Sequence, residues 1–139
     1  MDGIMIALVV AALVIGGLLM LFIQLTSGRK QKLDVEMYAK VWQMIGRSLQ
    51  SGQVDSMQMA IVKADKLLDK AMRESGVKGS TMGERLKARK GMWSNENAVW
   101  AAHKLRNQIA HDDHVSLNEQ TARRAMSGFE LALKDLGAL

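Results

Sequence analysis

The 139-residue sequence contains no cysteine and no proline. The lack of cysteine agrees with a reducing compartment. Without proline nothing interrupts the helical patterns, and the glycines stand mostly where those patterns stop. An alternation of apolar and polar residues, which is typical of strands, is also missing over any useful length. Together these absences predict an all-helical fold class.

Charge is missing from one long stretch near the N-terminus. Ile4 to Ile23 contains no charged or amide side chain. Twenty helical residues span about 30 Å, the thickness of the hydrocarbon core of a bilayer. A cleaved signal peptide is the alternative, but it requires a positively charged start, and this chain begins with Met1, Asp2 and Gly3. The pattern therefore predicts a transmembrane anchor over residues 1–28, with residues 4–25 in contact with the lipid bilayer.

The flanking charges predict an orientation for this anchor. Arg29, Lys30 and Lys32 follow the apolar stretch directly, whereas the other end offers only Asp2. The positive-inside rule then places the N-terminus outside and residues 29–139 in the cytoplasm. We therefore expect a single-pass protein of the inner (cytoplasmic) membrane.

Residues 29–139 are enough for one domain with a modest core. All 19 Lys and Arg residues fall in this range against 13 acidic residues, which gives it a net charge of +6. Such a balance favours an anionic partner, either nucleic acid or the anionic lipid surface of the inner leaflet. A basic surface that merely keeps the domain soluble is the alternative.

Helical periodicity and capping patterns predict the elements of this domain. We expect a helix from about Leu33 to Leu49, a second ending near Glu74, a short basic helix ending at Gly91, and two more capped by Ser94 and Ser116. Capping boxes are expected at Thr81 with Glu84 and at Ser116 with Glu119. Four principal helices with short connections imply an antiparallel four-helix bundle with one additional short helix.

Apolar residues three or four positions apart give each helix an inner face. The first helix is expected to bury Met37, Val41, Met44 and Ile45, the second Val54, Met57, Ile61, Ala64, Leu68 and Ala71, and the last Ala122, Ala125, Met126, Phe129, Leu133 and Leu136. Methionine is common, with 11 in the chain. Most methionines fall on these faces, which favours core packing over the alternative, an adaptable binding surface.

The segment HKLRNQIAH, near the end of the third principal helix, contains Arg106, Asn107 and His111. It resembles the signature of the HEPN family (higher eukaryotes and prokaryotes nucleotide-binding domains), in which an arginine is followed after four to six residues by a histidine. A polar residue commonly follows that arginine. The resemblance covers about residues 34–139 and implies a helical bundle with the motif near the end of a late helix.

The resemblance also implies a function, either RNA binding or metal-independent RNA cleavage. Arg106 would hold the phosphate, His111 would carry out acid–base work, and Asn107 would orient one of them. Arginine suits phosphate because its fork offers paired donors, and histidine suits proton transfer because its unperturbed pKa is about 6.5. Neither a metal ion nor a cofactor is expected.

The spacing of the motif adds a constraint. On a continuous helix Arg106 and His111 point about 140° apart, so both reach one substrate only if the helix ends between them or a second subunit contributes. HEPN nucleases commonly pair the motifs of two protomers, so we expect a homodimer. Asp113 stands where some HEPN toxins carry a tyrosine that a partner nucleotidyltransferase modifies, so no such antitoxin is expected.

Two other readings of the motif remain open. Arg106 could bridge to a nearby acid while His111 caps the helix end, where the helix dipole favours a cation. The domain would then be a non-catalytic, membrane-tethered module that binds a protein partner or a nucleotide. His103 and the segment HDDH also offer metal-ligand residue types, but their placement is more typical of a polar turn.

The densest basic patch lies between the capping box at Thr81 and the motif. It is formed by Arg85, Lys87, Arg89 and Lys90 and is followed by Trp93. With Lys104 it is expected to bind nucleic acid, the cations along the backbone and the indole against a base. Contact with anionic lipid is one alternative, and a solvated helix face with Trp93 packed beneath it is another.

Overall fold

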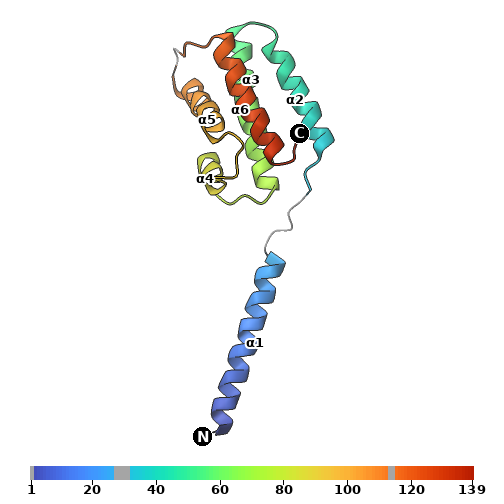
Figure 1. The fold of residues 1–139 in the computed structure, drawn as a ribbon, viewed down its shortest axis with the longest axis vertical. Helices are drawn as coiled ribbons and strands as arrows, with labels where there is room; N and C mark the ends of the chain where they lie inside the picture. Colours follow the sequence, from blue (N-terminus) through green and yellow to red (C-terminus); the bar gives the residue numbers. More distant parts are fainter. Residues whose placement is uncertain (1, 27–31, 113–114) are drawn as a thin grey trace.

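The computed structural model describes residues 2–26, 32–112 and 115–139 (Figure 1). Its helices are α1 (Asp2–Thr26), α2 (Val35–Leu49), α3 (Val54–Glu74), α4 (Met82–Ala88), α5 (Glu96–His111) and α6 (Glu119–Asp135). No strand occurs among the described residues. The all-helical fold class predicted from the sequence is confirmed.

The first helix, α1, is long and apolar enough from Gly3 to Ile23 to cross a membrane. None of that stretch is buried in the structure, and Figure 1 shows α1 extending away from the other helices. Large apolar side chains such as Ile4, Leu13 and Phe22 are more than 60% exposed along it. A helix with this surface needs an apolar environment that the rest of the described chain does not supply.

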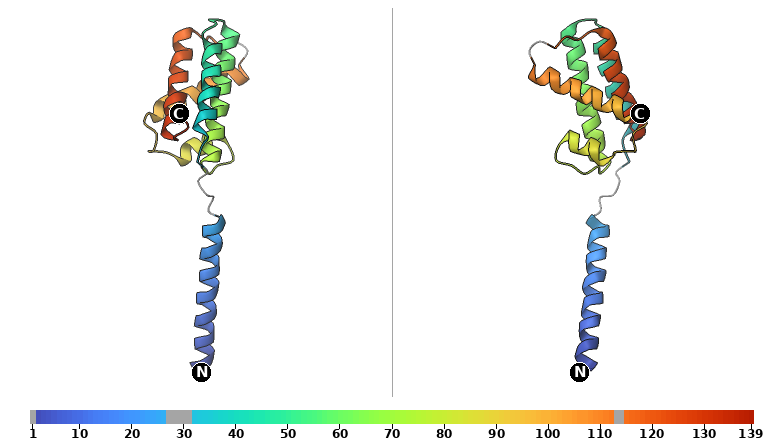
Figure 2. Two further views of the ribbon diagram at one scale, coloured as in Figure 1. Left: turned by 90° about the vertical axis from the view of Figure 1, so that its right-hand side faces the viewer. Right: turned by 60° about the vertical axis from the view of Figure 1, so that its left-hand side comes forward.

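The remaining helices form a bundle in which neighbours along the chain run in opposite directions (Figures 1 and 2). Helix α3 packs against α2 on one side and α6 on the other, and α5 packs against α6 and α3. Figure 2 shows α5 inclined to the other three long helices, with α4 near the end of α3. The predicted bundle with one short extra helix is therefore present.

The core of the bundle follows from the apolar stripes in the sequence. Phe129, Leu133 and Leu68 are fully buried, as the spacing of three and four residues requires. Met44 and Val54 were expected inside but are 65% and 45% exposed, so their assignment to the core is wrong. Met44 instead lines a shallow groove between α2 and α3.

Two of the predicted helix caps are wrong by one or two residues. The box at Thr81 and Glu84 is present in full, but the caps of α5 and α6 are Asn95 and Asn118 rather than Ser94 and Ser116. Asparagine caps as well as serine does. Ser94 is occupied elsewhere, since both its N–H and its hydroxyl bind the carboxylate of Asp135.

Helix α5 lies unusually close to α6 because of one glycine. A Cβ atom at Gly128 of α6 would stand 2.6 Å from the carbonyl oxygen of Ala98 in α5. Real Cβ atoms do not approach oxygen this closely, so the position needs a residue without a side chain. Gly128 therefore helps to set where α5, the helix that carries the motif, lies in the bundle.

Candidate functional site

Helix α5 is continuous through the Arg106–His111 motif. It begins after Asn95, whose side chain accepts a hydrogen bond from the N–H of Ala98, and it ends at His111. Because the helix does not end between Arg106 and His111, the two side chains leave it about 140° apart. Arg106 is half-buried toward α3, whereas His111 is exposed at the helix end. A single chain does not bring this pair together.

The partner of Arg106 is Asp65 of α3, a carboxylate that is only 4% exposed. Its Oδ1 lies 2.8 Å from Nδ1 of His103, and its Oδ2 lies 3.3 Å from Nε of Arg106, an ion-pair distance. A buried carboxylate is unfavourable unless such groups compensate it. The pairing therefore explains how an aspartate persists beside the apolar stripe of α3.

Asn107 connects the two residues that Asp65 holds. Its Oδ1 accepts a hydrogen bond of 3.0 Å from Nη1 of Arg106, and its Nδ2 lies 3.3 Å from Nε2 of His103. If Nδ1 of His103 donates to Asp65, then Nε2 is the acceptor for the Asn107 amide. Asp65, His103, Arg106 and Asn107 thus form a closed ring of polar contacts, which we call the Asp65 network.

A pocket of about 780 Å³ lies above the Asp65 network. It is lined by Asp65, Lys66, Asp69, Lys70, Arg73, Thr81, Met82, Gly83, His103, Arg106 and Asn107. Four cations therefore face it, three from α3 and one from α5. Three of these cations have a carboxylate partner: Arg106 pairs with Asp65, Arg73 with Asp69, and Lys70 with Glu74. Because only two carboxylates line the pocket against four cations, its lining is positively charged.

The wall opposite the network comes from the start of α4. A Cβ atom at Gly83 would lie 4.0 Å from Nε2 of His103, which is ordinary contact distance. Glycine at this position therefore leaves the histidine open toward the pocket, although the His103 side chain is only 13% exposed. The capping box of Thr81 and Glu84 fixes this wall, because it ties the chain before α4 to the first turn.

The predicted basic patch is divided between the interior and the surface. Arg85 is buried, pairs with Asp69 at 2.8 Å and donates to the carbonyl oxygen of Gly79. Trp93 is 7% exposed, and its indole N–H donates to the carbonyl oxygen of Leu86. This placement favours the alternative in which the indole packs beneath the helix face rather than against a base.

The remaining cations of the patch lie near the surface. Arg89 covers the Trp93 ring, with its guanidinium carbon 5.0 Å from the ring centroid. Lys87, Lys90 and Lys104 are exposed, and none of them lines the pocket above the Asp65 network. The structure therefore places these three lysines outside the pocket that Arg106 and Asn107 line.

Sequence reasoning missed Asp65 as a site residue and assigned His103 only a weak metal-ligand role. The available signals were a carboxylate adjoining the apolar stripe of α3, and the spacing of four residues that puts His103 and Asn107 on one face of α5. Within the described ranges no cluster of three or more metal-ligand residue types could hold a metal ion. Asp113 and His114 lie outside those ranges.

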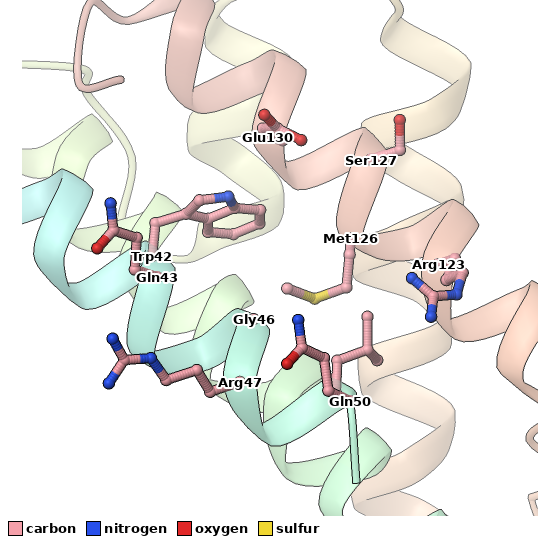
Figure 3. A pocket seen from close by; sticks show the side chains of 10 residues that line it. Trp42, Gln43, Gly46, Arg47, Gln50, Arg123, Met126, Ser127 and Glu130 are labelled. Carbon is pink, nitrogen blue, oxygen red and sulfur yellow. The ribbon is translucent and has the colours of Figure 1, made fainter. Parts of the chain in front are cut away.

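A second pocket, of about 550 Å³, lies between α2 and α6. Figure 3 shows the Trp42 indole and the Met126 side chain extending into the space between these helices. Two of its charged residues are engaged along α6, since Arg123 pairs with Glu119 and Glu130 with Lys134, and Arg47 of α2 adds a third charge. Unlike the first pocket, it contains no histidine, so it offers less chemistry.

Comparison of the chain with known protein families, characterised proteins and solved structures found no match. The resemblance to the HEPN family therefore stays a prediction that rests on Arg106, Asn107 and His111.

Proposed function

We propose that this protein is a membrane-anchored, HEPN-like RNA-binding protein that holds a phosphodiester in the pocket above the Asp65 network and cleaves it without a metal ion. One observation carries the proposal: the arginine and asparagine of the motif line a cationic pocket, held in place by a buried aspartate and a histidine. The function is that implied by the motif, and the pocket supplies a place for the phosphate.

The charges around the pocket support phosphate binding. Arg106 is fixed by Asp65 and Asn107, yet its side chain is still 28% exposed. A pre-positioned guanidinium loses less conformational freedom when it binds a phosphate. Lys66 is exposed and forms no ion pair with any residue in the described ranges, so its ammonium is available to a second phosphate oxygen.

Cleavage requires the groups that move protons in addition to those that hold the phosphate. His111 is the residue that the HEPN resemblance assigns to this work, and it is exposed at the end of α5. Since Arg106 of the same chain faces elsewhere, His111 would act with the pocket of a second protomer. The proposed cleaving form is therefore a homodimer, and tethering in the plane of a membrane would favour its assembly.

The membrane anchor is part of the same proposal. The apolar surface of α1 fits a bilayer, and the basic residues after it favour a cytoplasmic bundle and an external N-terminus. Protease treatment of sealed, right-side-out vesicles from the producing cells tests this orientation. The bundle should be protected until the vesicles are opened, and cleavage in sealed vesicles would contradict the topology.

The first test of function is RNA binding by the full chain in lipid nanodiscs, measured by fluorescence anisotropy in EDTA. Arg106→Ala should weaken binding about tenfold, the equivalent of one charge-assisted hydrogen bond. Lys104→Ala is the matched control, because it removes a cation from the same helix outside the pocket. Equal losses in the two variants would mean that binding is diffuse and that the pocket is not the site.

A second function is favoured by the groove between α2 and α3. It is lined by Met37, Val41, Met44, Ile45, Ser48, Lys63, Lys66, Leu67 and Lys70. The exposed methionine at position 44 and the lysines beside it suit an adaptable contact with a protein. If wild-type protein binds no RNA, this non-catalytic interaction module becomes the better description, and capture of partners from solubilised membranes tests it.

A further inference from the structure

Helix α5 carries two histidines, His103 in its middle and His111 at its end, and their surroundings differ. His111 is exposed and lies at the helix terminus, whereas His103 lies inside the pocket with its ring between Asp65 and Asn107. Eight residues, or about 12 Å of helix, separate them. Of the histidines that the structure describes, His103 is the one that shares a pocket with Arg106.

The contact with Asp65 decides what His103 can do. If Nδ1 donates to the carboxylate oxygen 2.8 Å away, the lone pair of Nε2 is the acceptor, and in the absence of a substrate it faces the Asn107 amide. The same carboxylate stabilises the imidazolium that forms when Nε2 takes up a proton. An aspartate–histidine pair in this arrangement is a positioned general base.

The atom of His103 that would receive the proton, Nε2, also faces the pocket that Arg106 lines. The Nε2 atom is directed toward the Asn107 amide at 3.3 Å, a long contact that a substrate hydroxyl can replace. Gly83 also borders this point: a Cβ atom there would lie 4.0 Å from Nε2, so glycine keeps additional room beside the ring. Arg106 borders the same pocket, so a phosphate held by its guanidinium would lie near the ring.

We propose that His103, oriented by Asp65, is the group that accepts the proton of the attacking 2′-hydroxyl, with Asp65 as its positioning residue. This inference rests on the proposed RNA cleavage and names a residue outside the Arg106–His111 motif. The base then belongs to the same chain as the phosphate-binding arginine. A homodimer is needed only for the second proton transfer.

The 2′-oxygen forms a bond to phosphorus while its proton passes to Nε2 of His103, and the bond from phosphorus to the 5′-oxygen breaks. The leaving 5′-oxygen takes a proton from an imidazolium, the role left to His111. The products are a 2′,3′-cyclic phosphate and a 5′-hydroxyl, and Arg106 faces the charge that develops on the phosphorane oxygens.

The test uses the full chain in nanodiscs, EDTA and a labelled RNA whose cleaved linkage is mapped first. His103→Asn keeps an amide that can donate to Asp65 but removes the basic nitrogen, and it should lower kcat about 100-fold or more. Asp65→Asn should lower kcat more than it raises KM, because Asp65 orients the base through His103 and also holds Arg106, which binds the phosphate. Gln108→Ala, an exposed change on the same helix, should behave as wild type.

A substrate with sulfur in place of the bridging 5′-oxygen separates the two histidines, because a thiolate leaves without needing a proton. The sulfur substrate should restore cleavage by His111→Ala and should not restore cleavage by His103→Asn. Circular dichroism and binding to 2′-O-methyl RNA, which lacks the nucleophile, show that each variant is folded and still holds RNA.

The outcomes are distinct. Full activity of His103→Asn, or its rescue by the sulfur substrate, overturns the assignment of His103 as the base. If wild-type protein binds RNA but cleaves none, the proton-transfer role and the nuclease part of the proposed function both fail while RNA binding stands. If it binds no RNA, the proposed function itself fails.

Discussion

Two cationic regions lie close together in this protein: the segment from Arg85 in α4 to Trp93 just after it, which we call the α4 segment, and the pocket between α3 and α5. The α4 segment has the higher density of basic residues in the sequence, yet its arginine at position 85 is buried in an ion pair and its indole is packed inside. The pocket draws its cations from two helices and presents them to one space. Density of charge along a chain is therefore a poor guide to where charge is available.

The physical reason is the cost of leaving a charge unpaired in the interior. Arg85 stabilises the junction of α3 and α4 because Asp69 and the carbonyl oxygen of Gly79 satisfy its guanidinium. The N–H donors that make these contacts are therefore occupied within the fold and do not serve a ligand. Arg106 is held only in part, and it remains accessible from the pocket. The first arginine should therefore matter for stability alone, and the second for binding as well as for the compensation of buried Asp65.

The largest expected effect is on stability. Arg85→Ala should lower the free energy of unfolding by about 3 kcal/mol, because it removes one member of a buried ion pair. Urea denaturation followed by circular dichroism measures this, and Lys87→Ala, an exposed cation in the same helix, should change stability by less than about 0.5 kcal/mol. Equal losses of stability in the two variants would contradict the distinction between the buried, ion-paired Arg85 and the exposed Lys87.

The next effect concerns the placement of α5, on which the pocket depends. Gly128→Ala should cost about 1–3 kcal/mol, since the new methyl group would overlap the backbone of α5 at Ala98. Gly46→Ala is the matched control, because a Cβ atom there meets nothing within 4 Å. Thermal unfolding of both variants checks the prediction, and an unchanged Gly128→Ala protein would contradict the close approach of the two helices.

A smaller effect separates the two regions in RNA binding. Neutralising Lys66 and Lys70 together, by substitution with alanine, should weaken binding about tenfold, because both line the pocket. The same change at Lys87 and Lys90 should weaken it less than about threefold, since exposed charges distant from a ligand are screened by salt. Anisotropy titrations at two salt concentrations measure both, and the reverse ranking would move the site to α4.

The smallest effect is pH-dependent and concerns the start of α4. Hydrogen bonds from Ser80 and from the backbone N–H of Thr81 lower the pKa of Glu84 below its usual value. The resulting stabilisation is present above the ordinary carboxyl pKa of 4.5 and is lost as the pH falls through the lowered value in the folded protein. Glu84→Gln should therefore be less stable than wild type at pH 7.

The difference in stability between wild type and Glu84→Gln should become smaller in acid. Urea midpoints at pH 7 and pH 3 measure it, and because every other carboxylate is shared, the comparison isolates Glu84. A gap between wild type and Glu84→Gln that persists unchanged at pH 3 would mean that the carboxylate charge contributes nothing to the capping box.

Local patterns account for what could be predicted from the sequence. The helices, the inner face of α6 and the capping box at Thr81 depend on residues three or four positions apart, and such spacings are visible in one dimension. The apolar stretch that forms α1 is equally local. Errors arose where a residue contacts another that is distant in the sequence. The hydroxyl of Ser94 binds Asp135, and Asn95 caps the helix instead.

The candidate site illustrates the same limit. The sequence by itself determined that the chain is helical, that one helix is apolar from Gly3 to Ile23, and that Arg106 and Asn107 stand near the end of a late helix. Only the tertiary structure decided that Asp65 meets His103, a residue 38 positions away. That contact depends on how α3 and α5 cross, and the crossing is set by side-chain packing across the whole bundle rather than by any local pattern.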